Sequence, residues 1–211
     1  PTRGLPAYSG SGGASGPSAA GLVGCSRYGS RKACSRGFAQ HVMSDDSLFR
    51  KIILELPKTS RILDLGSGNG GQRPDGWPVR YAKILGAAGY QVTAVDRKGG
   101  VGLPWPGVEY RQNSVEDFFK SEYKPFDFVI CSNILQFVDP AVIADLPKLV
   151  APGGYLFVRT FADQATVLEV LSSMDGLELL DERAYTVHED HPPEGPHTHD
   201  IVEIIFRRSS R

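Results

Sequence analysis

From about residue 45 onward, the apolar residues of this 211-residue chain are spaced as alternating strands and helices. Short apolar runs bounded by turn formers predict strands, and helical spacing behind a Ser, Asp or Pro predicts helices. The predicted strands are 61–65, 91–95, 108–111, 126–131, 155–159, 177–180 (extending toward 187) and 201–206. The predicted helices are 45–56, 78–88, a short one near 114, one opening at 139 and one over 164–174.

Strands that alternate with helices predict an α/β fold with a parallel sheet and helices on both of its faces. We therefore expect a Rossmann-like, doubly wound sheet of about seven strands within one domain, 45–211. The last two strands follow each other without a helix between them. The final strand should consequently be antiparallel, because a parallel connection needs a crossover.

The first 44 residues differ from the rest, because they contain no Asp or Glu. Residues 1–24 are rich in Gly, Ser, Ala and Pro, a composition that favours a flexible tail. An organelle transit segment and a natural start at Met43 are alternative interpretations. Residues 25–44 are basic and form a possible lid over an acceptor site, with Tyr28, Arg31 and His41 as candidate acceptor-site residues. A solvated charge is the alternative for the arginine.

Composition narrows the expected partners. The formal net charge of -1 gives no reason to expect general nucleic-acid binding. No apolar run reaches the length of a membrane span, so we expect no membrane association. Three cysteines do not make a disulfide framework, which favours a cytoplasmic location. The sequence does not indicate an oligomeric state.

The segment RILDLGSGNG, residues 61–70, joins a strand to a glycine-rich turn. Such a turn at the carboxyl end of a parallel strand lets the backbone approach a ligand closely. Asp96 ends the next predicted strand, where a carboxylate is placed to accept both hydroxyls of a ribose. Gly66, Gly68 and Gly71 also satisfy the dinucleotide fingerprint, so an NAD-dependent oxidoreductase remains an alternative.

Four ordered motifs together resemble the class I S-adenosylmethionine (SAM)-dependent methyltransferases. They are RILDLGSGNG, the strand ending at Asp96, FDFVICSNILQFVDP and LVAPGGYLFV. Asp64 favours this family over the dinucleotide enzymes, whose first strand is usually apolar at that position. The resemblance implies SAM as cofactor and methyl transfer to a small molecule or small oxyanion by in-line displacement, without a catalytic triad. A catalytically inactive SAM-binding partner subunit is a further alternative.

The resemblance also implies roles for particular residues. Asp64 would hold the amino end of the methionine, Asp96 the ribose, and Asn133 and Gln136 would line the place where donor meets acceptor. The expected cofactor-binding set is Asp64, Gly66, Ser67, Gly68, Asp96, Asn113, Ser114, Val115 and Asn133. Among these, the adenine contacts depart from the family, because Asn113, Ser114 and Val115 stand where an Asp is common.

Four of the five histidines lie in HEDHPPEGPHTHD, residues 188–200. Its prolines indicate a solvated loop. A metal site that adds Glu189, Asp190 and Glu194 to the histidines is the alternative, but the spacing matches no zinc motif, so we expect no bound metal. His197 and His199 alternate at period two and would point to one side of a strand. The segment also resembles, with modest specificity, the histidine-containing hairpin of tellurite-resistance-type methyltransferases, where these two residues would help to wall the acceptor pocket.

Overall fold

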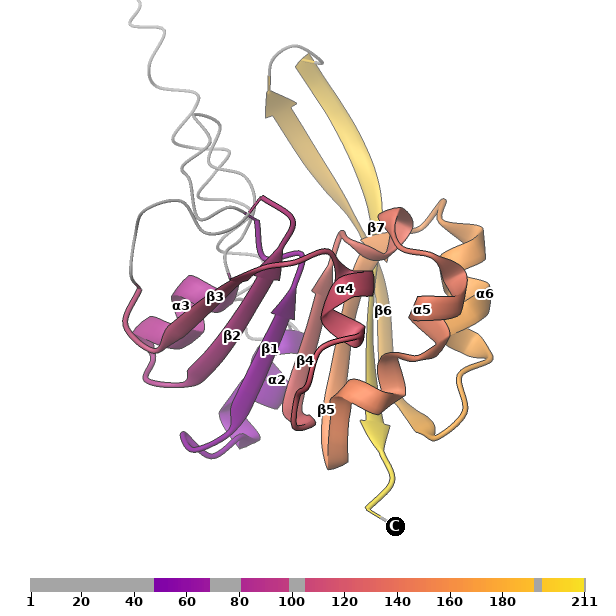
Figure 1. Cartoon of the computed structure of the whole chain (residues 1–211). Coiled ribbons are helices and arrows are strands. Elements are labelled where there is room, and N and C mark those ends of the chain that lie inside the picture. The colour runs from indigo at the N-terminus through magenta and orange to yellow at the C-terminus, as the bar shows by residue number, and fades with distance from the viewer. Residues whose placement is uncertain (1–47, 69–80, 99–104, 192–194, 211) are drawn as a thin grey trace, which may run out of the picture.

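The computed structural model describes residues 48–68, 81–98, 105–191 and 195–210. Within them, seven strands form one sheet in the order β3-β2-β1-β4-β5-β7-β6 (Figure 1). The strands are β1 Arg61–Leu65, β2 Gln91–Asp96, β3 Val108–Gln112, β4 Phe126–Ser132, β5 Val150–Phe161, β6 Leu177–His191 and β7 Gly195–Arg208. The helices are α2 Leu48–Glu55, α3 Tyr81–Ala87, α4 Val115–Phe119, α5 Pro140–Ala144 and α6 Ala165–Ser172, with short 3₁₀ turns η1 Leu135–Phe137 and η2 Leu146–Leu149.

The predicted topology is confirmed. Strands β3, β2, β1, β4 and β5 pair in parallel, whereas β7 lies antiparallel between β5 and β6. A hairpin forces antiparallel pairing between β6 and β7, while the parallel neighbours are joined by crossovers. The carboxyl ends of β1, β2, β4 and β5 therefore meet at one edge of the sheet.

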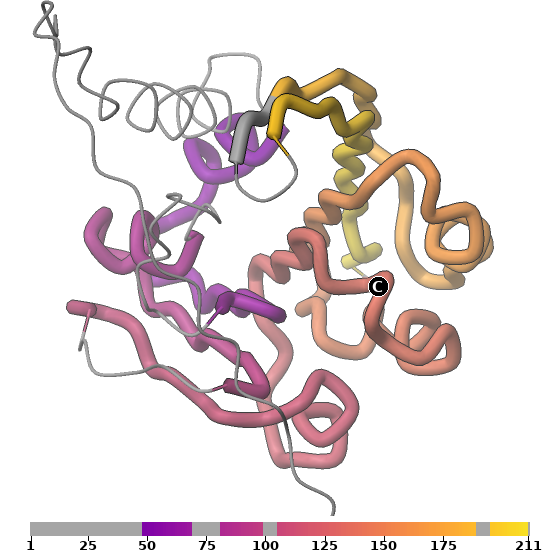
Figure 2. The backbone as a smooth tube through the Cα atoms, turned by 90° about the horizontal axis from the view of Figure 1, so that it is seen from above, coloured from indigo at the N-terminus to yellow at the C-terminus, as the bar shows by residue number. Residues whose placement is uncertain are grey.

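Helices cover both faces of the sheet (Figure 2). Successive strand residues point to opposite faces, so Leu63 and Leu65 enter the core beneath α4, α5 and α6. Ile62 points the other way, into a core shared with α2 and α3. Each helix buries one apolar stripe, which is the arrangement that the helical spacing predicts. None of the helices in the described parts of the chain is long and apolar enough to cross a membrane.

Local signals at helix starts are also confirmed. The Ser114 hydroxyl oxygen accepts a hydrogen bond from the Asp117 N–H at 3.0 Å and caps α4. Asp139 caps α5 by accepting from the Ala141 N–H at 2.8 Å, ahead of a proline in the first turn. The expected tail, the possible lid with Tyr28, Arg31 and His41, and the start of the first predicted helix lie outside the described residues.

The prediction of a solvated loop over the histidine-rich segment is wrong. Strands β6 and β7 remain paired as far as His191 and Gly195, and form a two-stranded ribbon beyond the end of β5 at Phe161 (Figure 1). The prolines misled the prediction because position 196 lies past β5, where no strand of the described residues borders one edge of β7 and proline is tolerated. The Thr186 hydroxyl donates across the ribbon to Asp200 Oδ1 at 2.6 Å.

Candidate active site

The glycine turn after β1 is fastened to the end of β2 by main-chain hydrogen bonds. Gly66 and Gly68 have φ of +71° and +74°, a region that favours glycine. The N–H groups of Gly66 and Ser67 both donate to the Val95 carbonyl, at 2.8 and 3.1 Å. A Cβ on Gly66 would lie 2.6 Å from the Ile134 side chain, so this glycine also lets the turn after β4 approach the turn after β1.

Asp96 stands at the tip of β2 as predicted, facing the glycine turn. Its Oδ2 accepts from the Gly68 N–H at 3.0 Å, and its Oδ1 accepts from the Lys98 N–H at 2.9 Å. These two bonds fix the orientation of the carboxylate. Each oxygen keeps a further lone pair, which leaves capacity for the two ribose hydroxyls that we predict it to bind.

Asp64 is buried beneath the turn, with 2% of its surface exposed. Its Oδ2 accepts from the Ala82 N–H in α3 at 2.9 Å. Burial raises the pKa of this carboxyl to about 7; the hydrogen bond from Ala82 opposes the shift, and the charge of Asp96 adds to it. A cationic ammonium group nearby would favour the charged form, so the carboxyl fits the predicted role at the amino end of the methionine.

The predicted adenine contacts lie between β3 and α4. Asn113 donates its N–H to the Arg111 carbonyl at 3.2 Å, and Val115 is the first residue of α4. The Ser114 hydroxyl oxygen caps α4, which gives this residue a structural role. Its contact with adenine stays a prediction.

Asn133, directly after β4, has a φ of +51°, the only positive value of a residue other than glycine in the described parts of the chain. Its N–H donates to the Arg159 carbonyl at 2.8 Å, and its own carbonyl accepts from Gln136 Nε2 at 3.0 Å. Within the described ranges, the side-chain amide oxygens of Asn133 and Gln136 are buried without a hydrogen-bond partner. Asn133 immediately precedes Ile134, whose side chain packs against the glycine turn, so the predicted residue Asn133 lies next in sequence to that contact.

Two buried charges, which the sequence analysis did not single out, lie further along the same sheet edge. Arg159 on β5 and Glu203 on β7 are each 1% exposed. The Tyr185 hydroxyl bridges them: it accepts from Arg159 Nε at 3.1 Å and donates to Glu203 Oε1 at 2.8 Å. The signal that could have found them is a charge inside each of two apolar strands, YLFVRTF and IVEIIF.

His197 and His199 share one face of the ribbon, as their spacing predicted. Their rings are 4.8 Å apart, and the His199 ring is 4.9 Å from the Phe161 ring at the end of β5. His197 Nδ1 lies 2.7 Å from the Gly195 carbonyl oxygen. Among the residues that the structure describes, no three His, Cys, Asp or Glu side chains gather as a metal site.

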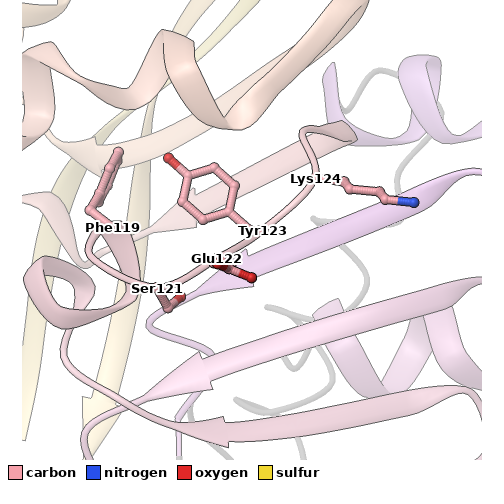
Figure 3. A pocket seen from close by; sticks show the side chains of 5 residues that line it. All are labelled: Phe119, Ser121, Glu122, Tyr123 and Lys124. Atoms are coloured by element: carbon pink, nitrogen blue, oxygen red, sulfur yellow. The ribbon is translucent and has the colours of Figure 1, made fainter.

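A shallow hollow elsewhere on the surface is lined by Phe119, Ser121, Glu122, Tyr123 and Lys124 (Figure 3). It precedes the amino end of β4, whereas the glycine turn follows the carboxyl end of the parallel strand β1. The hollow is therefore at the opposite edge of the sheet and is separate from the candidate active site.

A sheet of this order, with a glycine turn tied to a strand-end carboxylate, defines the class of protein, and family comparison agrees with it. Residues 36–195 match a family described as "Methyltransferase domain". The chain belongs to this family, and it is a class I SAM-dependent methyltransferase with SAM as its cofactor. The glycine turn, Asp96 and the buried Asp64 carboxyl fit that cofactor.

Two curated relatives are named ubiquinone biosynthesis O-methyltransferase. The protein of Xylella fastidiosa strain M23 is 34% identical over 114 residues, covering 48% of this chain and 42% of the relative. That of Aromatoleum aromaticum is 31% identical over 157 residues, covering 69% and 57%. The chain thus spans about half the length of the curated relatives it matches.

Among solved structures, TehB from Haemophilus influenzae is similar to this chain with a TM-score of 0.54 and 14% identity. The match covers 83% of this chain and 67% of that one. This likeness supports the fold.

Proposed function

We propose that this chain transfers the methyl group of SAM to an oxygen atom of a small molecule. One observation carries the proposal: the turn at Gly66 and Gly68 is fastened to Asp96 at the sheet edge where the polar corner at Asn133 also lies. A cofactor held by the turn and the carboxylate would extend its reactive end toward that corner.

Bound SAM supplies a sulfonium with a good leaving group. The chain then has to bind the cofactor, orient the acceptor and exclude water. Asp96 would hold the ribose and Asp64 the ammonium end, while Asn133 and Gln136 would orient the acceptor for in-line attack. Such positioning alone is worth several kcal/mol, on the order of 7–11 in well-oriented cases.

The name of these relatives, O-methyltransferase, supports oxygen as the acceptor atom. Their identity of 31–34% is high enough to make shared chemistry a reasonable proposal. Tellurite-type oxyanions remain the other acceptor class, favoured by the ribbon that carries His197 and His199.

The test combines binding and turnover. Calorimetry should show binding of SAM and of S-adenosylhomocysteine but not of NAD. Release of S-adenosylhomocysteine is then measured with catechol as a hydroxyl acceptor and tellurite as an oxyanion acceptor, and we expect turnover with catechol. Binding of NAD instead would favour the oxidoreductase, and cofactor binding without turnover of either probe would favour the inactive partner subunit.

A further inference from the structure

Three polar residues stand in register across the acceptor side of the sheet. Ser132 on β4 pairs with Arg159 on β5, which pairs with Glu203 on β7. Neighbouring strands are about 4.8 Å apart, so Glu203 on β7 lies on the order of 10 Å from Ser132 on β4, with Arg159 on β5 between them. By strand alternation, Arg159 shares its face with Phe157, and Glu203 shares its face with Ile205, in the core beneath α2 and α3.

Tyr81 links this row to the cofactor side. It is the first residue of α3 and precedes Ala82, whose N–H donates to Asp64. Its ring packs against Phe49 at 4.6 Å and Phe157 at 5.9 Å. Burial raises the pKa of Tyr81, the charge of Arg159 opposes this shift and that of Glu203 adds to it, so all three lie within electrostatic range.

One oxygen of the Glu203 carboxylate accepts a hydrogen bond and the other does not. Oε1 accepts from the Tyr185 hydroxyl at 2.8 Å and lies 3.9 Å from Arg159 Nε. Oε2 is 3.9 Å from Arg183 Nε, beyond hydrogen-bond distance, and accepts no hydrogen bond from any described residue. Burial raises the pKa of Tyr185 to about 12, which keeps its hydroxyl protonated as a donor to Glu203 near neutral pH.

If this buried ion pair served only the stability of the fold, both carboxylate oxygens would be expected to accept hydrogen bonds, because an unsatisfied buried acceptor is destabilising. An oxygen left open is explained if a bound molecule completes it. Glu203 and Asp64 lie on the same face of the sheet by strand alternation, and the main-chain carbonyl of Arg159, the register neighbour of Glu203, accepts a hydrogen bond from the Asn133 N–H.

We propose that Glu203 is the general base for a hydroxyl acceptor, with Tyr185 and Arg159 as its positioning residues; this rests on the proposed function. The acceptor O–H gives its proton to Glu203 Oε2 as the oxygen attacks the methyl carbon. The sulfur–methyl bond breaks, and its electron pair stays on sulfur. The products are a methyl ether, S-adenosylhomocysteine and a protonated Glu203, which returns its proton to water.

The experiment compares Glu203→Gln with the wild-type chain on two probes, catechol and thiophenol. Catechol must lose a proton during transfer, whereas thiophenol is already ionised at pH 8 and needs no base. We expect kcat with catechol to fall by about 100-fold or more, because general bases contribute 10²–10⁴-fold. The rate with thiophenol should change less than about 3-fold, since positioning is retained.

Controls separate chemistry from folding and from cofactor binding. Glu182→Gln changes an exposed carboxylate on β6 and should leave both rates unchanged. Tyr185→Phe keeps the carboxylate but removes its orienting donor, and should slow catechol by about 10-fold while sparing thiophenol. Glu203→Asp should restore part of the catechol rate. Calorimetry with S-adenosylhomocysteine should give the same affinity for every variant.

Several outcomes would overturn the proposal. An equal loss with both probes would assign Glu203 a structural role, and so would failure of both Glu203→Gln and Tyr185→Phe to fold. A wild-type chain that binds S-adenosylhomocysteine but does not methylate catechol would refute the substrate class. Failure to bind S-adenosylhomocysteine would instead refute the proposed function itself.

Discussion

The two halves of the candidate site are built by different means. On the cofactor side, main-chain N–H groups of Gly66, Ser67 and Gly68 tie one turn to the end of the neighbouring strand. On the proposed acceptor side, side chains of Arg159, Tyr185 and Glu203 bridge three strands. The first half depends on backbone shape, and the second depends on the identity of a few buried polar groups.

This difference teaches which changes each half tolerates. A turn built from glycines with positive φ fails when a side chain is added, whatever the chemistry of that side chain. A side-chain network fails when a donor or a charge is removed, even if the shape is preserved. Substitutions can therefore test the two halves separately.

The largest effect is expected for Gly68→Val. A β-branched side chain at φ +74° is strained and would enter the space that the cofactor needs, so binding of S-adenosylhomocysteine should be lost in calorimetry. Gly176→Val is the matched control, because Gly176 has φ +80° and nothing within 4 Å of an added Cβ. Both variants should lose a similar amount of stability, about 1–3 kcal/mol, and only the first should lose binding. Normal binding by Gly68→Val would mean that the turn is merely structural.

Asp64→Asn should change stability and cofactor affinity in opposite directions above neutral pH. The folded-state pKa of about 7 exceeds the unfolded value near 3.8, so the folded state holds the proton more tightly. Stability should therefore fall as pH rises between about 4 and 7, by on the order of 4 kcal/mol. Asparagine cannot lose this proton, so the variant should not show the slope. In urea unfolding, Asp64→Asn should gain stability relative to the wild-type chain between pH 5 and pH 8. It should nevertheless bind the cofactor more weakly.

The control for Asp64 is Asp117→Asn. The pKa of Asp117 is lowered by hydrogen bonds from Lys120 and Ser114, so any pH dependence it contributes has the opposite sign. An unchanged pH slope in Asp64→Asn would contradict the assignment of a buried, proton-retaining carboxyl.

Asp96→Ala should weaken cofactor binding by about 1–3 kcal/mol, because two ribose hydroxyls would lose a charged acceptor and Gly68 its partner. Asp163→Ala removes another carboxylate just past the end of a strand, away from the glycine turn, and should leave affinity unchanged. Equal affinity of Asp96→Ala and the wild-type chain in calorimetry would contradict the assignment of Asp96 to the ribose. The cofactor half of the site would then depend on the main chain alone.

Prediction from sequence worked where the structural cause is local. The parallel strands and the caps of α4 and α5 follow from apolar spacing and from one or two neighbouring residues. The glycine turn is equally local, since Gly66 and Gly68, two residues apart, supply its positive φ angles. Over residues 188–199, the prediction failed because the proline-based rule could not include the pairing with β6, which extends the strand regardless of local preference.

The sequence by itself determined the doubly wound α/β fold and where the glycine turn and Asp96 lie, because those features depend on periodicity and on contiguous residues. The methyltransferase interpretation came from the resemblance of four ordered motifs to that family. Only the tertiary structure decided that Arg159, Tyr185 and Glu203 meet. These residues are separated by 26 and 18 positions, and the insertion of β7 between β5 and β6 brings them together. Strand register fixes which buried charges become neighbours, and register is a property of the assembled sheet rather than of any one segment.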